Sequence, residues 1–186
     1  MEDSATATAV LRPLLGRRLL AVTEARSWVD DGPVTGIEGL VHFWLHFEGQ
    51  PPVMAHGCGE RLDLEVEEPY PSYDMQEFGS TVVGPVQPWD LLGGVIGQRH
   101  IDVGLIQGYC NPPDVGGVVL RFDQSDLAIA SFGDEWFLTQ GPIPDKLQQY
   151  LSFTGWLGAI DTTAESQRGR SQGLTEDAHS HGLFMD

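Results

Sequence analysis

Lysine is almost absent from this chain, and basic residues in general are scarce. Lys146 is the only lysine among 186 residues, and ten basic residues stand against 27 acidic ones, giving a formal net charge of −17. A surface with this charge repels nucleic-acid phosphates and anionic membranes, and it accelerates encounters with basic partners. The composition therefore argues against direct nucleic-acid binding and predicts a basic protein partner. The alternative, an acidic surface that serves only solubility, stays open.

Long apolar runs and cysteines are also lacking. No stretch approaches the roughly 20 apolar residues that span a bilayer, and the amino terminus has no basic segment followed by an apolar one, as a signal peptide would. We therefore expect no membrane association and a cytoplasmic location. The two cysteines, Cys58 and Cys110, are too few for a disulfide scaffold, and we expect both to be free thiols.

Catalytic motifs are missing as well. The chain has no Gly-x-Ser-x-Gly elbow, phosphate-binding loop, His-Glu-x-x-His sequence or dinucleotide fingerprint. The adjacent Asp134 and Glu135 would point to opposite faces of a strand rather than converge on one bond. Cys58 with His56, or Cys110 with His100, would pair a thiol with an imidazole, but nothing in the sequence orients the base. We therefore expect a protein that is not an enzyme and that has no cofactor.

What the chain does contain is a pattern that recurs in order. The matched landmarks are Gly16 with Gly97, Phe47 with Phe122, Gly59 with Gly133, and Pro69 with Pro142. The separation between partners drifts slowly, from 81 to 73 residues, as expected for a tandem duplication with small length changes in its loops. Two unrelated meanders with similar turns and hydrophobic alternation are the alternative explanation.

Apolar residues alternate with polar ones in several short stretches, as in half-buried strands. The stretches are 17–25, 40–47, 53–58 and 61–67 in the first half, and 99–107 and parts of 116–138 in the second. Short helices are expected over 10–15 and 145–151. The sequence thus predicts an α+β fold, mainly antiparallel β, in which two duplicated β-meanders with short helices pack as a pseudo-twofold sandwich or partly open barrel.

The expected domain organisation follows from composition. It comprises a flexible amino terminus (1–9), a first meander (10–78), a linker (79–88), a second meander (89–160) and a flexible polar tail (161–186), with both meanders in one globular domain.

Histidines and a thiol gather on two strands that we expect to pair. The candidates are His42, His46, His56 and Cys58. Imidazole and thiolate groups suit zinc, but no metal-binding spacing enforces their approach. Histidines beside a tryptophan more commonly form a half-buried surface, so we expect no metal.

An acidic stripe on the stretch 61–67 is the main candidate for partner binding. Leu62 and Leu64 alternate there with acidic residues, so the carboxylates should share the outer face at steps of about 6.5 to 7 Å. The candidate site consists of this stripe, two further acids and two aromatic anchors: Asp63, Glu65, Glu67, Asp30, Asp31, Trp28 and Trp44. Protection of a sheet edge against aggregation is the alternative role for such charges.

In general character, a small acidic β-rich chain without catalytic residues resembles the immunity proteins that neutralise bacterial toxins, although no motif carries that resemblance. It implies a non-catalytic, inhibitor-type module that binds a basic protein. One alternative is a structural or adaptor subunit held by its carboxyl-terminal tail, which ends in Leu183, Phe184, Met185 and Asp186. Another is a small-molecule-binding or enzymatic barrel, which would require an apolar cavity between the halves.

Overall fold

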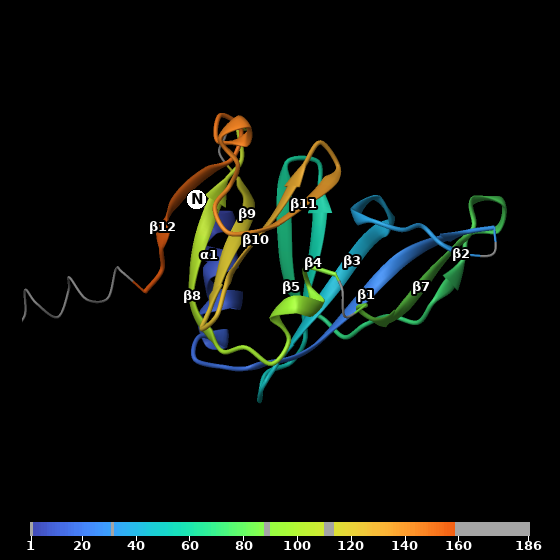
Figure 1. Ribbon diagram of the computed structural model, residues 1–186, viewed down its shortest axis with the longest axis horizontal. Helices are drawn as coiled ribbons and strands as arrows, with labels where there is room; N and C mark the ends of the chain where they lie inside the picture. The colour runs from blue at the N-terminus through green and yellow to red at the C-terminus, as the bar shows by residue number, and fades with distance from the viewer. Residues whose placement is uncertain (1, 31, 88–89, 110–113, 159–186) are drawn as a thin grey trace, which may run out of the picture.

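Two antiparallel sheets and one short α-helix make up the part of the chain described by the computed structural model, residues 2–30, 32–87, 90–109 and 114–158 (Figure 1). In spatial order, the first sheet contains β5 (Arg61–Val66), β4 (Val53–Cys58), β3 (Leu40–Phe47), β1 (Leu19–Val29), β7 (Ser80–Pro85) and β6 (Tyr73–Asp74), and β2 (Gly32–Pro33) pairs with β1. The second contains β11 (Glu135–Gln140), β10 (Asp126–Phe132), β9 (Val115–Phe122), β8 (His100–Gln107) and β12 (Ser152–Trp156). The prediction of a mainly antiparallel β protein is confirmed.

The two sheets share one connectivity. Apart from the two-residue strands β2 and β6 of the first sheet, each sheet has four successive strands side by side as a meander, and a fifth strand from later in the chain pairs with the first. That fifth strand is β7 in the first sheet and β12 in the second. The sequence predicts a linker over 79–88, but Ser80–Pro85 forms β7, with Thr81 almost fully buried beside β1.

The amino terminus also differs from expectation. Instead of a flexible segment over 1–9, the chain forms α1 (Glu2–Leu11), followed by the 3-10 turn η1 (Arg12–Leu14). Ala7, Leu11 and Leu14 are buried there, and α1 contacts both β5 and β9. The helix forms because this narrow apolar face packs in the space between the two sheets.

A shorter turn replaces the helix that we expected over 145–151. Only η5 (Asp145–Leu147) has helical geometry. The apolar residues of the segment still pack inward, because Leu151 is buried and Leu147 contacts the outer face of the second sheet.

The main core lies between the facing sides of the two sheets. Its largest members on the first sheet are Leu19, Phe43 and Phe47, and on the second Leu120 and Leu127, all at most 2% exposed. The outer face of each sheet has a smaller apolar cluster, covered by the chain segment that follows the meander. Tyr70 packs on the first outer face, and Ile143 and Leu151 pack on the second.

The two halves meet in a short antiparallel ribbon at Arg18 and Arg99. Gly16 N–H donates to the carbonyl of His100 and Gly97 N–H donates to that of Leu19, both at 2.8 Å. The side chains form a second reciprocal pair of hydrogen bonds: Arg18 donates to the carbonyl of Gly97, and Arg99 donates to that of Gly16. Each contact therefore has a counterpart 81 residues away. Both glycines have positive φ angles, 77° and 88°, which glycine adopts most readily.

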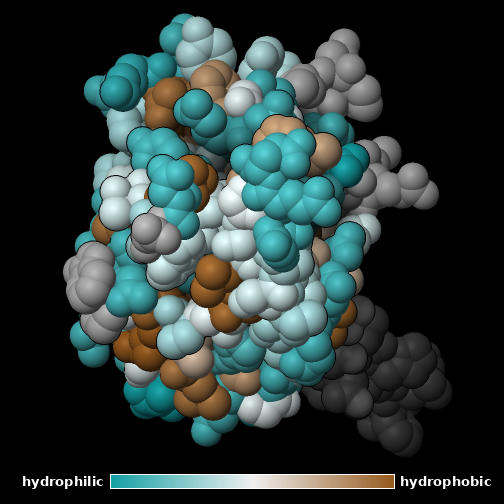
Figure 2. All heavy atoms as spheres, turned by 90° about the vertical axis from the view of Figure 1, so that its right-hand side faces the viewer, coloured by the Kyte–Doolittle hydropathy of each residue, from teal (hydrophilic) through white to brown (hydrophobic). Residues whose placement is uncertain are grey.

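At the far end of the first sheet, β1, β2 and β7 extend beyond the second sheet (Figure 1). The surface at this end is largely hydrophilic, and its apolar residues form small separate patches (Figure 2). No helix within the described residues is long and apolar enough to cross a membrane.

Candidate functional site: an acidic pocket beside β1

Three polar or amphipathic side chains occupy alternate positions of β1 and line one pocket. These are Glu24, Arg26 and Trp28. They lie on the same face of β1 as Val22, which is buried in the core nearer the start of the strand. They line a pocket of about 480 Å³. This volume lies within the range of ordinary ligand sites, about 300 to 1,000 Å³.

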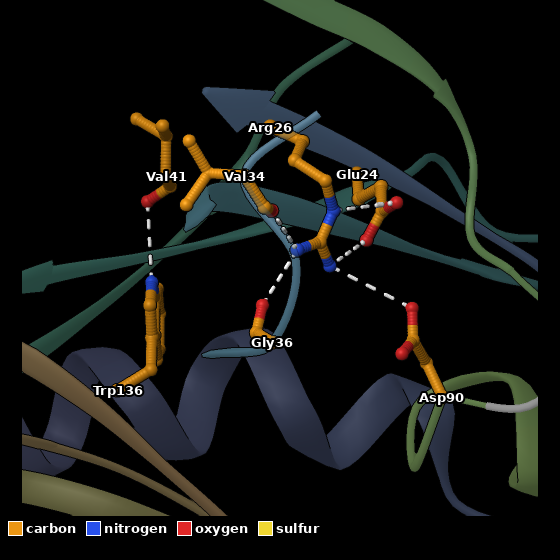
Figure 3. A network of polar contacts seen from close by, with 7 residues as sticks. All are labelled: Glu24, Arg26, Val34, Gly36, Val41, Asp90 and Trp136. Carbon is orange, nitrogen blue, oxygen red and sulfur yellow. Dashed lines mark hydrogen bonds and ion pairs between the residues drawn. The ribbon is translucent and has the colours of Figure 1, made fainter. Parts of the chain in front are cut away.

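Arg26 is the centre of the polar network in this pocket (Figure 3). Its Nε donates to Glu24 Oε1 at 3.0 Å, and its Nη2 donates to Oε2 of the same carboxylate at 2.8 Å. Its Nη1 donates to the carbonyls of Val34 and Gly36, at 3.0 and 2.6 Å. The guanidinium thus holds the 34–36 loop against β1. Its orientation is fixed by four hydrogen bonds.

A second carboxylate approaches the same guanidinium from the chain after β7. Asp90 Oδ2 lies 3.6 Å from Arg26 Nη2 (Figure 3). Burial raises the pKa of Asp90, the nearby Glu24 carboxylate raises it further, and Arg26 opposes both effects. The hydrogen bond from Arg26 to Glu24 raises the pKa of the guanidinium, which therefore stays charged. With both carboxylates ionised, the cluster has a net charge of −1.

Apart from Thr35 and Gln87, the remaining pocket wall is apolar and partly aromatic. Trp28 lies on one side, with Pro33, Pro85 and Val82 nearby. Trp28 and Val82 are half-buried, so each is still accessible to a ligand. An aromatic face beside an unbalanced carboxylate suits a cation on an apolar stem, such as an arginine or lysine side chain.

Two further pockets are lined by residues of both halves. One has a volume of about 340 Å³, and its wall includes His42, His56, Asp134, Glu135 and Trp136. A second pocket of about 130 Å³ lies beside the same Glu24 and Arg26, with Leu40, Leu92 and Leu138 in its wall. A drug-sized molecule needs at least about 300 Å³. The smaller pocket is therefore below that size. The larger one reaches it, but its lining is mostly polar, whereas the small-molecule alternative requires an apolar cavity.

The acidic stripe lies elsewhere. Asp63 and Glu65 are on β5, three strands from β1 and on the opposite face of the sheet, and Glu67 follows β5. Three strand spacings correspond to about 14 Å. Asp63 accepts a hydrogen bond from Arg61 at 2.8 Å, while Glu65 and Glu67 are exposed. The structure thus separates the stripe from Trp28.

Of the remaining predicted anchors, Trp44 is not accessible. It is 0% exposed and lies under Tyr70, with 5.0 Å between the ring centroids. The segment after β5 covers the outer face of the sheet, so Trp44 stabilises that cluster and does not present a surface to a partner. Asp30 is exposed at the end of β1. Asp31 lies outside the described residues.

The histidine and cysteine candidates come together only in part. His42 and His56 pair across β3 and β4 with 4.5 Å between ring centroids, and burial, reinforced by His56, lowers the pKa of His42 to about 4. His46 instead contacts the Thr23 hydroxyl at 2.9 Å, and Cys58 is exposed. Within the described ranges, no group of three or more His, Cys, Asp or Glu residues is placed to hold a metal ion.

The structure describes both members of only one of the two thiol and imidazole pairs. Cys58 is exposed and lies two residues beyond His56 on β4. His100 is fully buried in the core, and its predicted partner Cys110 lies outside the described residues.

Sequence reasoning missed Glu24, Arg26 and Asp90. The available signal was two charged residues, Glu24 and Arg26, on the face of β1 that Val22 marks as inward. Buried charges are costly unless paired, so charges at such positions indicate a partner or a site. Asp90 had no comparable signal, because only the fold brings it to β1.

No protein-family model matches this chain, and no curated protein or solved structure is similar enough to match it.

Proposed function

We propose that this protein is a non-catalytic binding module of inhibitor type that engages a basic protein partner. An arginine or lysine side chain of the partner enters the pocket formed by Glu24, Trp28 and Asp90. The observation that carries the proposal is the unbalanced charge of this pocket, where two carboxylates share the single guanidinium of Arg26.

The geometry favours Asp90 as the group that meets the incoming cation. Glu24 is 5% exposed and both of its oxygens accept from Arg26, so it has little capacity for another donor. Asp90 is more accessible, with 30% of its side chain exposed, and its distance of 3.6 Å from Arg26 is longer than a hydrogen bond. A partner cation would complete the charge balance of the cluster.

Trp28, on the apolar wall of the pocket, also favours binding of a cationic side chain. A cation over an aromatic ring is stabilised by about 0.5 to 2 kcal/mol, depending on desolvation. The aliphatic stem of an arginine or lysine would pack against Pro33 and Pro85. The net charge of −17 would steer a basic partner toward the protein at long range.

We also propose that the two halves arose by tandem duplication and form a pseudo-twofold open sandwich. The shared connectivity of the sheets supports this, as do the reciprocal contacts at Arg18 and Arg99. The acidic pocket has no counterpart in the second half by this comparison, since Leu105 and Gln107 stand 81 residues after Glu24 and Arg26.

Calorimetric titration of the protein with a tetra-arginine peptide whose termini are blocked tests the pocket. We expect Asp90→Asn to weaken binding roughly tenfold or more, because a hydrogen bond to a charged group contributes about 1.5 to 3 kcal/mol. Trp28→Ala should weaken binding about threefold to thirtyfold through the lost cation–aromatic contact.

Glu65→Gln is the matched control, because it removes the same net charge from the opposite face of the sheet. It should leave the affinity within about twofold, as expected for an exposed charge outside the interface. Equal weakening by Asp90→Asn and Glu65→Gln would mean that only the total charge attracts the peptide, and the pocket would then have no special role.

A further inference from the structure

A hollow on the described surface lies in the second half, away from the acidic pocket. It has a volume of about 600 Å³ and lies on the outer face of the second sheet, under the segment that follows β11. Its walls include Val119, Ile143, Leu151, Phe153 and Trp156, with Arg121 and Asp126 as its charged residues.

Comparison of the two sheets explains why space exists here. One row of paired residues crosses the first sheet through Met54, Trp44, Thr23 and Pro85. The corresponding row of the second sheet runs through Ala128, Val119, Gly104 and Trp156. At the two central strands of the meander, the second half therefore has alanine and valine where the first has methionine and tryptophan.

Because of this difference, the second sheet lacks the large side chains that fill the outer face of the first sheet. In the first half, Trp44 and Met54 are 0% and 9% exposed and pack beneath Tyr70. In the second half Val119 and Ala128 are much shorter, and Ile143 and Leu151 pack in the same cluster. A pocket remains where the first half is packed with its own side chains.

Arg121 is held rigidly at the wall of this pocket. Its Nε and Nη2 donate to the two oxygens of Asp126, each at 3.1 Å. Its guanidinium carbon lies 3.7 Å from the centroid of the Trp156 ring. Within the described structure, Nη1 has no hydrogen-bond partner, so this edge of the guanidinium can donate to a ligand.

We propose that this pocket binds a small aromatic carboxylate. The ring of the ligand packs against Val119, Ile143 and Leu151, with Phe153 and Trp156 as the aromatic wall. The carboxylate accepts from Nη1 of Arg121, which Asp126 and Trp156 hold in place. Guanidinium is suited to carboxylate recognition, because its planar N–H groups match the geometry of the two oxygens. This site does not depend on the basic partner proposed for the acidic pocket, and either proposal can fail alone.

Calorimetry and amide chemical-shift mapping of the full chain with indole-3-acetate test the proposal. We expect saturable one-to-one binding, with shift changes centred on β9, β12 and the 141–151 segment. Val119→Trp should weaken binding more than about tenfold by filling the pocket with the side chain of the first half. Val119→Phe is a milder second variant at the same pocket-lining position with the same expected direction, so the test stands if the first variant does not fold.

Arg121→Gln should weaken indole-3-acetate about tenfold while leaving the binding of neutral indole unchanged. Arg61→Gln is the matched control, because Arg61 also forms an exposed ion pair with an aspartate, Asp63, at 2.8 Å. Absence of saturable binding would overturn the proposal, as would affinity that survives both filling variants. Equal affinity for indole-3-acetamide would overturn the assignment of a carboxylate ligand.

Discussion

At the scale of single residues, His100 is a polar side chain in the core, and neither of its ring nitrogens has a hydrogen-bond partner in the described structure. It is 0% exposed and packs between Phe47 and Phe122, at ring distances of 5.5 and 5.6 Å. Burial lowers the pKa of His100, and the backbone of Leu14 and Asp102 opposes the shift without reaching hydrogen-bond geometry. The equivalent position of the ribbon in the first half is Leu19, which is also fully buried.

Replacing His100 with leucine should therefore stabilise the fold. Each buried polar group without a partner costs about 1 to 3 kcal/mol, and leucine already occupies the matching place. We expect the free energy of unfolding, measured by urea titration at pH 7.5, to rise by about 1 to 3 kcal/mol in His100→Leu. The reverse exchange, Leu19→His, should lower it. A loss of stability in His100→Leu would show that the imidazole has a partner that the leucine cannot replace.

His42 and His100 make the free energy of unfolding fall as the pH is lowered. The pKa of His42 is lowered to about 4 and that of His100 is also lowered, from an ordinary value of 6.5. Below pH 6.5 the unfolded chain binds protons that the folded chain does not, so stability is lost as pH falls from 6.5 toward 4. Urea titrations at pH 7.5, 6.5, 5.5 and 4.5 should show a flatter decline for His100→Leu. Parallel curves for the two proteins would contradict the assignment to His100.

At the scale of elements, the Glu24–Arg26 pair joins β1 to the loop before β3. Removing one member of a buried ion pair leaves the other charge uncompensated and costs about 3 to 5 kcal/mol. We expect Arg26→Gln to lower the free energy of unfolding by that amount, and the double variant with Glu24→Gln to regain part of it. Arg61→Gln, at an exposed pair, should cost under about 1 kcal/mol. Equal effects of Arg26→Gln and Arg61→Gln would contradict the structural role of Arg26.

The helix α1 is the second element whose role can be measured. Leu11 is 0% exposed within it, whereas Leu20, at the start of β1, is 54% exposed. Leu11→Ala should lower the free energy of unfolding by about 2 to 5 kcal/mol because it leaves a cavity at the sheet junction. Leu20→Ala makes the same chemical change on the surface and should have little effect. A small effect of Leu11→Ala would mean that α1 is not part of the core.

These elements also show what the sequence can and cannot predict. Strict alternation of apolar residues was enough to predict strands such as β5, because one face of each is buried. It was not enough for α1, whose Ala- and Thr-rich sequence has almost no apolar stripe and is helical because Ala7 and Leu11 meet two strands. The acidic pocket brings β1 together with Asp90, more than 60 residues later in the chain. Local sequence patterns cannot predict a contact between residues so far apart.

At the scale of the whole molecule, two sheets of one connectivity have different surfaces. The first half has a filled outer face, and its Glu24 and Arg26 form the charged pocket together with Asp90 from the start of the second half. The second has an open pocket beside Arg121. The two sheets thus share a strand connectivity and differ where their side chains reach the surface.

The central claim is that the acidic pocket recognises a basic partner. The most direct test is an affinity pull-down from the native cell lysate at low and high salt, with the wild-type protein, Asp90→Asn and Glu65→Gln as baits and mass spectrometry of the retained proteins. We predict that wild type and Glu65→Gln retain one basic protein at low salt and release it at high salt, and that Asp90→Asn does not retain it. Retention by Asp90→Asn equal to that of the wild type, or the absence of any basic protein from the wild-type eluate, would contradict the claim.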